Sequence, residues 1–281
     1  MSVYAGRVAT EIDRLVIAGH RVAGEAPRPP AMDSMRAHPG LLTTTAIVLL
    51  ARPLTRDDLG RITPYIAPDL EDALVENNVS EGVLRRDGAH LVLTDEGRMV
   101  AEAVVELQDS AVVALWEAGA EVVAGLEDVA RAVVAGGRSK VPPSSPDAFS
   151  LYADPAVLDR PTPEARVLRA ITAVRYWRAD AHRAALRAAD LGAAEAHALN
   201  RLWDAHRGVE RVGQGRTEPG TRGLAAIEAR GLAADGEITA AGIGQRNAIE
   251  SDTDARTEPL YATLDETERD RLLAGLRSLR G

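Results

Sequence analysis

The chain has 281 residues, of which 46% are hydrophobic and 27% are charged, and it contains no cysteine. This composition is typical of a globular protein with a full core, and it excludes disulfides, thiolate metal sites and cysteine nucleophiles. The net charge is −9, so a DNA-binding protein of this sequence would need a local basic face, because duplex DNA is bound largely through its phosphates.

The first predicted element is an amphipathic helix at the amino terminus. The stretch MSVYAGRVATEIDRLVIAGHR carries Glu11 and Asp13 within its apolar pattern, which is not the pattern of a signal peptide. No apolar run of the sequence reaches the roughly 18 residues that span a bilayer. We therefore expect a soluble, cytoplasmic protein.

Residues 41–134 predict the element order of a winged helix-turn-helix. Residues 41–53 form a short buried helix, Thr55 caps a second helix, and Pro68 begins a third. The turn signal Asp87-Gly88 and the apolar stretch HLVLT then predict a small β-hairpin. One or two long amphipathic helices over residues 95–134 follow the hairpin.

The second half repeats this order after a proline-rich break. Six prolines fall within residues 136–163, which we predict to be a linker between a first unit, 1–135, and a second unit, 164–281. Helices are expected over residues 161–191, 192–206 and 218–232. A second, shorter hairpin follows, and two more helices are expected after it, over residues 240–264 and 265–279.

The two hairpins indicate an internal repeat. Asp87 and Asp235 are 148 residues apart, whereas Thr94 and Thr239 are 145 apart, so the second wing should be three residues shorter. The 145-residue offset continues beyond the hairpin. We therefore predict a mainly α fold, a tandem (pseudo-dimeric) winged helix-turn-helix with two small β-hairpin wings.

Several stretches resemble known families. LTDEGR (93–98), after the first Asp-Gly turn, resembles the wing-to-helix junction of MarR-type regulators. The second half resembles an actinobacterial helix-turn-helix family related to SalK, whose members often lie in or near antibiotic gene clusters. MarR proteins are homodimers with one winged helix per chain, so the resemblance implies either a monomer that imitates this dimer or a homodimer. The stretches that carry the SalK-type resemblance are YWRADAHRAAL (176–186), IEARGLAADGEITAAG (227–242) and IESDTDARTEPLY (249–261).

The two predicted units differ in the charge that they would present to DNA. Residues 57–87 hold eight acids against three arginines, so phosphates would repel the first recognition helix. Residues 201–222 hold five arginines against three acids, with the Gly and Thr content of a phosphate-contacting segment. The alternative for this segment is an ordinary solvated loop. The candidate DNA-binding residues are Arg207, Arg211, Arg216, Thr217, Thr221 and Arg222.

The MarR resemblance also implies a ligand. Such dimers often bind aromatic compounds in the cleft between the dimer helices and the DNA-binding lobes, so we expect a small aromatic or polyketide-like ligand. Arg178 and His182 share one helix face at i and i+4, whereas the aromatic candidates have the alternative role of core anchors. The candidate ligand-binding residues are Trp116, Tyr176, Trp177, Arg178, His182, Trp203 and Tyr261.

Other chemistry is not indicated by the sequence. The histidines lack metal-ligand spacing, and nucleotide-binding and serine-hydrolase motifs are absent, so we expect no metal, cofactor or catalytic residue. The leading interpretation is a small-molecule-responsive, DNA-binding transcriptional regulator of MarR-like type. The alternative is a winged-helix protein that has lost DNA binding and binds a natural product, for self-resistance, or transforms one, in secondary metabolism. A third interpretation is a protein-interaction module that uses the acidic face.

Overall fold

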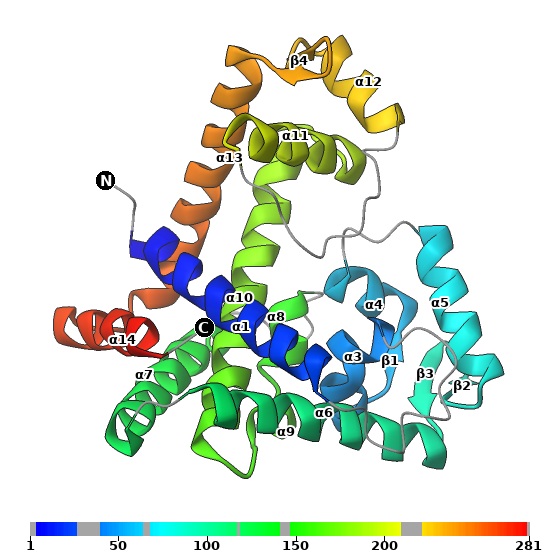
Figure 1. Cartoon of the computed structure of the whole chain (residues 1–281), viewed down its shortest axis with the longest axis vertical. Coiled ribbons are helices and arrows are strands. Elements are labelled where there is room, and N and C mark those ends of the chain that lie inside the picture. The colour runs from blue at the N-terminus through cyan, green and yellow to red at the C-terminus, as the bar shows by residue number, and fades with distance from the viewer. Residues whose placement is uncertain are drawn as a thin grey trace. The chain divides into compact units, whose positions relative to one another are not determined.

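The computed structural model describes residues 4–26, 40–63, 68–116, 119–140, 147–208 and 221–279. These residues are mainly helical, with two small antiparallel sheets (Figure 1). The chain divides into two compact units. Unit 1 comprises Met1–Trp177 and Glu258–Gly281, and unit 2 comprises Arg178–Thr257.

Unit 1 contains the longest helices of the first half together with the last helix of the chain. Its helix α1 packs against α6 and α14, and α7 also packs against α14. Apolar residues at helical spacing, such as Val8, Ile12 and Leu15, bury one face of α1. These helices are α1 (Tyr4–Glu25), α6 (Asp95–Leu115), α7 (Ala120–Arg138), the first part of α10 (Pro163–Ala188) and α14 (Glu266–Ser278), which follows the 3₁₀ helix η1 (Glu258–Tyr261).

Unit 1 also contains three short helices and a three-stranded sheet. The strands are antiparallel in the order β1-β3-β2; β1 contacts α4, β2 contacts α5 and β3 contacts α3. Thr55 forms a capping box with Asp58 at the start of α4, as its position in the sequence predicts. The elements are α3 (Gly40–Ala51), β1 (Leu54–Thr55), α4 (Arg56–Ile62), α5 (Pro68–Ser80), β2 (Leu84–Asp87) and β3 (His90–Leu93).

Unit 2 has its own small core. Leu199, Ile227 and Ile249 come from three different helices, and all three are almost completely buried in one hydrophobic cluster. Besides the second part of α10, the unit contains α11 (Ala193–His206), α12 (Thr221–Ala229), β4 (Ala233–Ala234), β5 (Glu237–Ile238) and α13 (Ala240–Thr257).

The compact units differ from the predicted domains, 1–135 and 164–281. Much of the predicted linker belongs to unit 1, where it forms α8 (Ala148–Tyr152) and α9 (Pro155–Leu158). Phe149 and Val157 of this segment are completely buried. Pro155 starts α9 and Pro163 starts α10, because proline is favourable at the first helical position. The described segment between them still packs into the core.

The second wing is four residues shorter than the first, and not three. The paired strands and loop cover residues 84–93 in the first hairpin and 233–238 in the second. Both hairpins have a two-residue loop, and each cross-strand pair adds one residue to each strand. The two hairpins can therefore differ in length only by an even number of residues. The first loop is Gly88-Ala89, whereas the second is Asp235-Gly236, with φ angles of 52° and 77°. The two Asp-Gly pairs therefore occupy different positions in their turns.

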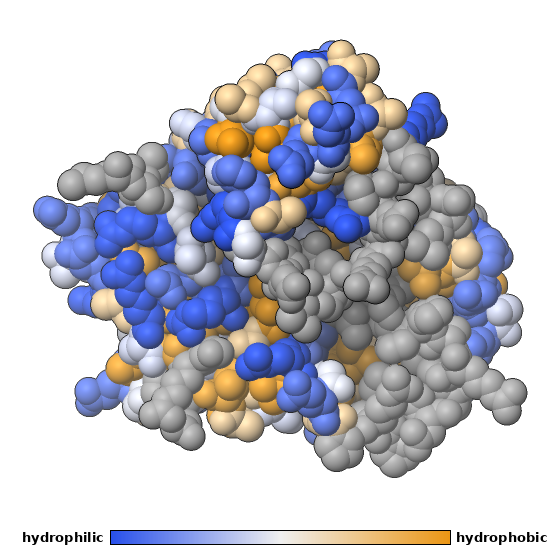
Figure 2. Space-filling view, turned by 45° about the horizontal axis from the view of Figure 1, so that its top comes forward, coloured by the Kyte–Doolittle hydropathy of each residue, from blue (hydrophilic) through white to orange (hydrophobic). Residues whose placement is uncertain are grey.

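Large exposed apolar side chains are few among the described residues. They are Ile17, Met99, Val113 and Val122, all in unit 1. In the view of Figure 2, hydrophilic residues are spread over much of the described surface, with hydrophobic residues between them.

Candidate functional site

Close contacts hold α12 of unit 2 against α11 and against the end of α10. A Cβ on Gly223, at the start of α12, would lie 2.5 Å from the carbonyl oxygen of Ala194 in α11, so the two helices approach as closely as glycine allows. Arg230, just after α12, donates to the carbonyl oxygen of Ala189 at 3.1 Å and to that of Asp190, at the end of α10. The three helices thus form the fixed corner of a helix-turn-helix.

The loop between α11 and α12 holds most of the predicted DNA-binding residues. Arg211, Arg216 and Thr217 lie outside the described residues, and of Thr221 only the backbone, at the first position of α12, is described. Arg207 and Arg222 are described, and both are exposed, one at each end of the loop.

Arg207 lies over an aromatic ring. Its guanidinium carbon is 5.8 Å from the ring centroid of Trp203, which also faces the ring of His206 at 6.0 Å. Such a cation–π contact orients the guanidinium at the carboxyl end of α11. The structure therefore brings together Arg207, predicted to contact DNA, and Trp203, predicted to bind a ligand.

A threonine joins the second wing to α13. The Thr239 hydroxyl donates to the carbonyl oxygen of Gly231 at 2.7 Å and accepts from the backbone N–H of Gly242 at 3.1 Å. Gly242 fits here because it has no side chain, since a Cβ would lie 2.1 Å from the carbonyl oxygen of Leu232. The junction fixes the direction in which the wing leaves α13.

The first wing has the same junction. The Thr94 hydroxyl donates to the carbonyl oxygen of Gly82 and accepts from the backbone N–H of Gly97 at 2.9 Å. A Cβ on Gly97 would lie 1.8 Å from the carbonyl oxygen of Val83. Gly82 has a positive φ angle of 74°, close to the 70° of Gly231 in the second wing.

The helix that precedes the first wing, α5, is acidic. Glu71 is only 3% exposed and is paired with Arg56 of α4. Asp72 and Glu76 have side chains that are 64% and 62% exposed, and they are paired with Arg56 and Arg86. Arg56 and Arg86 are thus paired with carboxylates, and the repulsion between this helix and phosphates stays a prediction.

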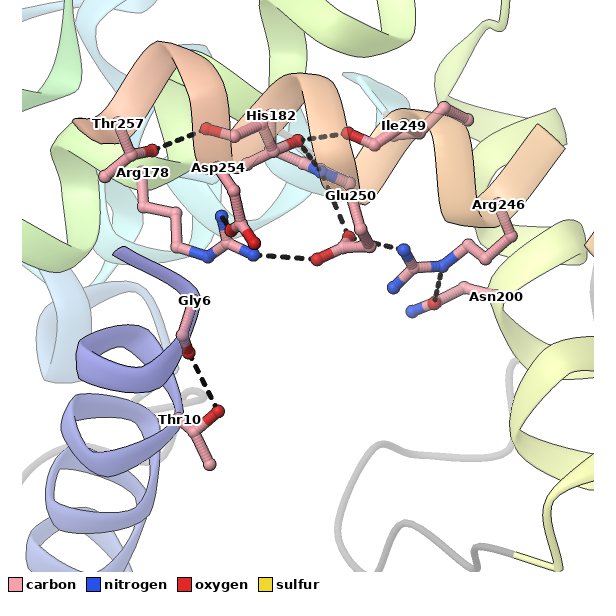
Figure 3. A network of polar contacts seen from close by, with 11 residues as sticks. Gly6, Thr10, Arg178, His182, Asn200, Arg246, Ile249, Glu250, Asp254 and Thr257 are labelled. Atoms are coloured by element: carbon pink, nitrogen blue, oxygen red, sulfur yellow. Dashed lines mark hydrogen bonds and ion pairs between the residues drawn. The ribbon is translucent and has the colours of Figure 1, made fainter. Parts of the chain in front are cut away.

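A second candidate site in unit 2 is a network of charged side chains between α10 and α13 (Figure 3). The Glu250 carboxylate accepts from Arg178 at 2.7 Å, forms an ion pair with Arg246, and lies 3.6 Å from Nδ1 of His182. Arg178 also reaches Asp254 at 3.0 Å. The network joins two predicted ligand-binding residues, Arg178 and His182, through Glu250.

His182 has a buried second partner and a shifted pKa. Its Nδ1 lies 3.1 Å from the hydroxyl oxygen of Thr253, a residue without exposed surface. Burial lowers the pKa of His182; Glu250 opposes the shift, and the guanidiniums of Arg246 and Arg178 add to it. The ring is therefore neutral near pH 7.

Two of the predicted ligand-binding aromatics lie in unit 1, at the middle of α10. Tyr176 stacks on Tyr152, with ring centroids 3.9 Å apart and planes 13° apart. Trp177 meets Phe149 edge to face at 5.0 Å. Both contacts tie α10 to α8, which is the packing role that the sequence left open for the aromatic candidates.

The other two aromatics of unit 1 are buried elsewhere. Trp116, which follows α6, is buried, and its indole N–H has no hydrogen-bond partner among the described residues. Tyr261 is buried and meets the ring of Tyr4 edge to face at 5.2 Å. The four aromatics of unit 1 thus have separate neighbours, and their role in ligand binding stays a prediction.

Sequence reasoning missed three members of the charged network. Arg246, Glu250 and Asp254 follow one another at intervals of four, a spacing that places them on one face of α13. This stretch looks like an ordinary charged helix surface when it is read alone. Only the structure shows that α13 runs beside α10, so that these side chains meet Arg178 and His182.

Other site types find no support in the described ranges. No group of three histidine, aspartate or glutamate side chains within them could hold a metal ion. None of the described helices is both long and apolar enough to span a membrane. An open hollow of about 430 Å³ lies beside the first wing and is lined by Arg52, Pro53, Asp87, His90 and Val92. None of these is a predicted site residue.

One protein-family model matches part of the chain. Residues 144–281 match the model of a helix-turn-helix family, a span that includes all of unit 2 and the carboxy-terminal part of unit 1. The match supports a helix-turn-helix domain in this part of the chain, where α11 and α12 form the corner described above. No curated protein and no solved structure matches the chain.

Proposed function

We propose that the protein is a DNA-binding transcriptional regulator of MarR-like type that acts in the cytoplasm and responds to a small molecule. The observation that carries this proposal is the helix-turn-helix family match over residues 144–281. Within that span, the close contact of Gly223 with Ala194 and the hydrogen bonds of Arg230 hold α12 as a rigid second helix. A second helix held in this way is the element that enters the major groove in helix-turn-helix proteins.

The proposed architecture is a tandem of two winged-helix units. It is supported by the matching junctions of the two wings, in which Thr94 and Thr239 make the same two contacts. Helices α7 and α14 follow these junctions at the same sequence offset of about 145 residues and pack against each other. A contact between equivalent helices is what a chain that imitates a MarR-type dimer requires.

We propose that the second winged helix contacts DNA and that the first does not. The exposed Arg207 and Arg222 flank the loop before α12 and form no ion pair with other described residues. In contrast, Arg56 and Arg86 near α5 are held by carboxylates. The proposed DNA-binding residues are Arg207, Arg211, Arg216, Thr217, Thr221 and Arg222, with the arginines on phosphates and the threonines donating to backbone oxygens.

The experiment that tests this function is a DNA-binding titration of the full-length protein. Fluorescence anisotropy is measured with the duplex from upstream of its own gene and with a random duplex. Between roughly 50 and 200 mM salt we expect a steep loss of affinity, because each phosphate contact releases counterions. Absence of binding to both duplexes at low salt would contradict the proposal.

A second candidate function is a winged-helix protein that has lost DNA binding and binds or transforms a natural product. The observation that favours it is the acidity of the surfaces that would face DNA. Asp72 and Glu76 are exposed on α5, and the tip of the second wing carries the exposed Asp235 and Glu237. A thermal-shift screen against secondary metabolites distinguishes the two functions, since stabilisation without any duplex binding is expected only for the second.

A further inference from the structure

The His182 imidazole is held in one tautomer by its neighbours in unit 2. The Thr253 hydroxyl donates its hydrogen to the carbonyl oxygen of Ile249 at 2.7 Å, so its oxygen acts as an acceptor toward His182 Nδ1 at 3.1 Å. The Glu250 carboxylate, 3.6 Å from the same nitrogen, is also an acceptor. Both neighbours require a hydrogen on Nδ1, which leaves Nε2 of the neutral ring with a lone pair.

The Nε2 atom is open to an incoming molecule. It forms no hydrogen bond with any described residue, and it is not one of the buried polar atoms that lack a partner. The side chain of His182 is 24% exposed, so solvent reaches the part of the ring that Thr253 does not cover. Nε2 is therefore an acceptor at the surface of the network.

The charged groups around the ring form ion pairs with one another, although Nη1 of Arg178, Nη1 of Arg246 and Oδ1 of Asp254 are buried without good hydrogen-bond geometry. Arg178 is paired with Glu250 and Asp254, and Arg246 is paired with Glu250 and also donates to Asn200 at 3.1 Å. The formal charges of the two arginines and the two acids cancel. The network thus offers an incoming molecule a neutral acceptor and no surplus charge that would select an ion.

We propose that this face of unit 2 binds a small molecule that donates a hydrogen bond from a neutral hydroxyl or N–H group to His182 Nε2. Thr253 and Glu250 act as positioning residues, because they hold the hydrogen on Nδ1. The donor keeps its proton, since burial and two guanidiniums disfavour the imidazolium. The site rests on the proposed response to a small molecule and names the chemistry of that molecule.

The test uses two probes that differ only in the donor. Phenol carries a hydroxyl, and anisole carries a methoxy group in its place. In an NMR titration of the ¹⁵N-labelled full-length protein, we expect phenol to shift the Nε2 resonance of His182. We also expect it to bind roughly tenfold more tightly than anisole, the most that one neutral hydrogen bond contributes.

Two matched variants distinguish the loss of Nε2 from a general loss of folding. In His182→Asn the side-chain amide can still donate to Thr253, but Nε2 is gone, so phenol binding should fall to the level of anisole while the unfolding temperature is kept. His90→Asn changes an exposed histidine of the first wing and should leave phenol binding unchanged.

Several outcomes would overturn the proposal. Equal binding of phenol and anisole to the wild-type protein would show that no hydrogen bond from the ligand is made. Unchanged phenol binding by His182→Asn would show that His182 is not the acceptor. Preferential binding of benzoate would assign the site to Arg178 and Arg246 instead. An Nε2–H tautomer in the ¹⁵N spectrum of the free protein would contradict the geometry. A protein that binds duplex DNA but fails with phenol refutes this site and leaves the regulator function standing.

Discussion

Thr239 donates its hydroxyl hydrogen to the carbonyl oxygen of Gly231 at 2.7 Å and thereby joins the second wing to α13. The same oxygen accepts from the first turn of α13, so one side chain both caps the helix and closes the hairpin. Thr94 makes the equivalent pair of contacts in the first wing. The direction of each wing is therefore set by its junction with the following helix.

Two glycines of α13 should respond in opposite ways to alanine. In Gly242→Ala the new Cβ would lie 2.1 Å from the Leu232 carbonyl oxygen, so we expect a loss of about 1–3 kcal/mol in the free energy of unfolding of unit 2. Gly244 has no atom within 4 Å of that position, and Gly244→Ala should be neutral or stabilising by up to about 1 kcal/mol. Hydrogen exchange of the α13 amides measures both. Equal effects of the two substitutions would show that the close approach is absent in solution.

The junction threonine should contribute as an N-cap. In Thr239→Ala both the cap and the bond to Gly231 are lost, and we expect unit 2 to lose about 1 kcal/mol. The matched control is Thr10→Ala, whose exposed hydroxyl bonds only to the carbonyl oxygen of Gly6 in its own helix. Chemical denaturation should show no measurable change for the control. A similar small change for both variants would mean that the wing is held by other contacts.

The buried Glu71 should make Arg56 the more important of two surface arginines in unit 1. Arg56→Ala leaves the carboxylate with only the Thr63 hydroxyl at 2.9 Å, and we expect a loss of about 2 kcal/mol. Arg86→Ala removes a pair with the exposed Glu76 and should cost less than about 1 kcal/mol. Thermal unfolding of the two variants compares them directly. The reverse order would contradict the role of Glu71 in joining α4 to α5.

The stability of unit 2 should depend on pH through His182. Its pKa is lowered in the folded protein, by burial first and by Arg246 and Arg178, with Glu250 opposing. The unfolded chain therefore takes up the proton first, and stability should fall as the pH drops below about 6.5, the ordinary pKa, and level off below the folded value. Hydrogen exchange of unit 2 between about pH 8 and pH 5 measures this. The His182→Asn variant should lose this part of the pH dependence, and an identical profile in both proteins would contradict it.

Most helices could be predicted from the sequence because their caps and apolar periodicity are local signals. Thr55 caps α4 and Pro68 starts α5, as their positions indicate. The wing lengths were misjudged because Asp-Gly looks the same at either position of a turn, whereas Asp235 lies in its loop and Asp87 pairs within its strand. Composition likewise predicted a linker where Phe149 is buried, because proline density reports helix breaks but not packing.

The candidate sites could be predicted only in part. Arg178 and His182 were singled out by their spacing along one helix, and the structure brings them together through Glu250. That acid comes from another helix, α13, so no local pattern connects it with α10. The predicted aromatic ligand residues lie in several separate contacts. Their scatter could not be predicted, because a sequence without an alignment does not show which aromatics share a surface.

The measurement that tests the account most directly compares two pairs of arginines in DNA binding. We predict that Arg216→Ala combined with Arg222→Ala abolishes binding of the full-length protein to duplex DNA, or, where binding remains, lowers its salt slope by about 2. The matched pair, Arg85→Ala with Arg86→Ala, removes the same charge from the first wing and should leave affinity and salt slope unchanged. Loss of binding in the first-wing pair with full binding in the loop pair would contradict the claim that the second winged helix contacts DNA.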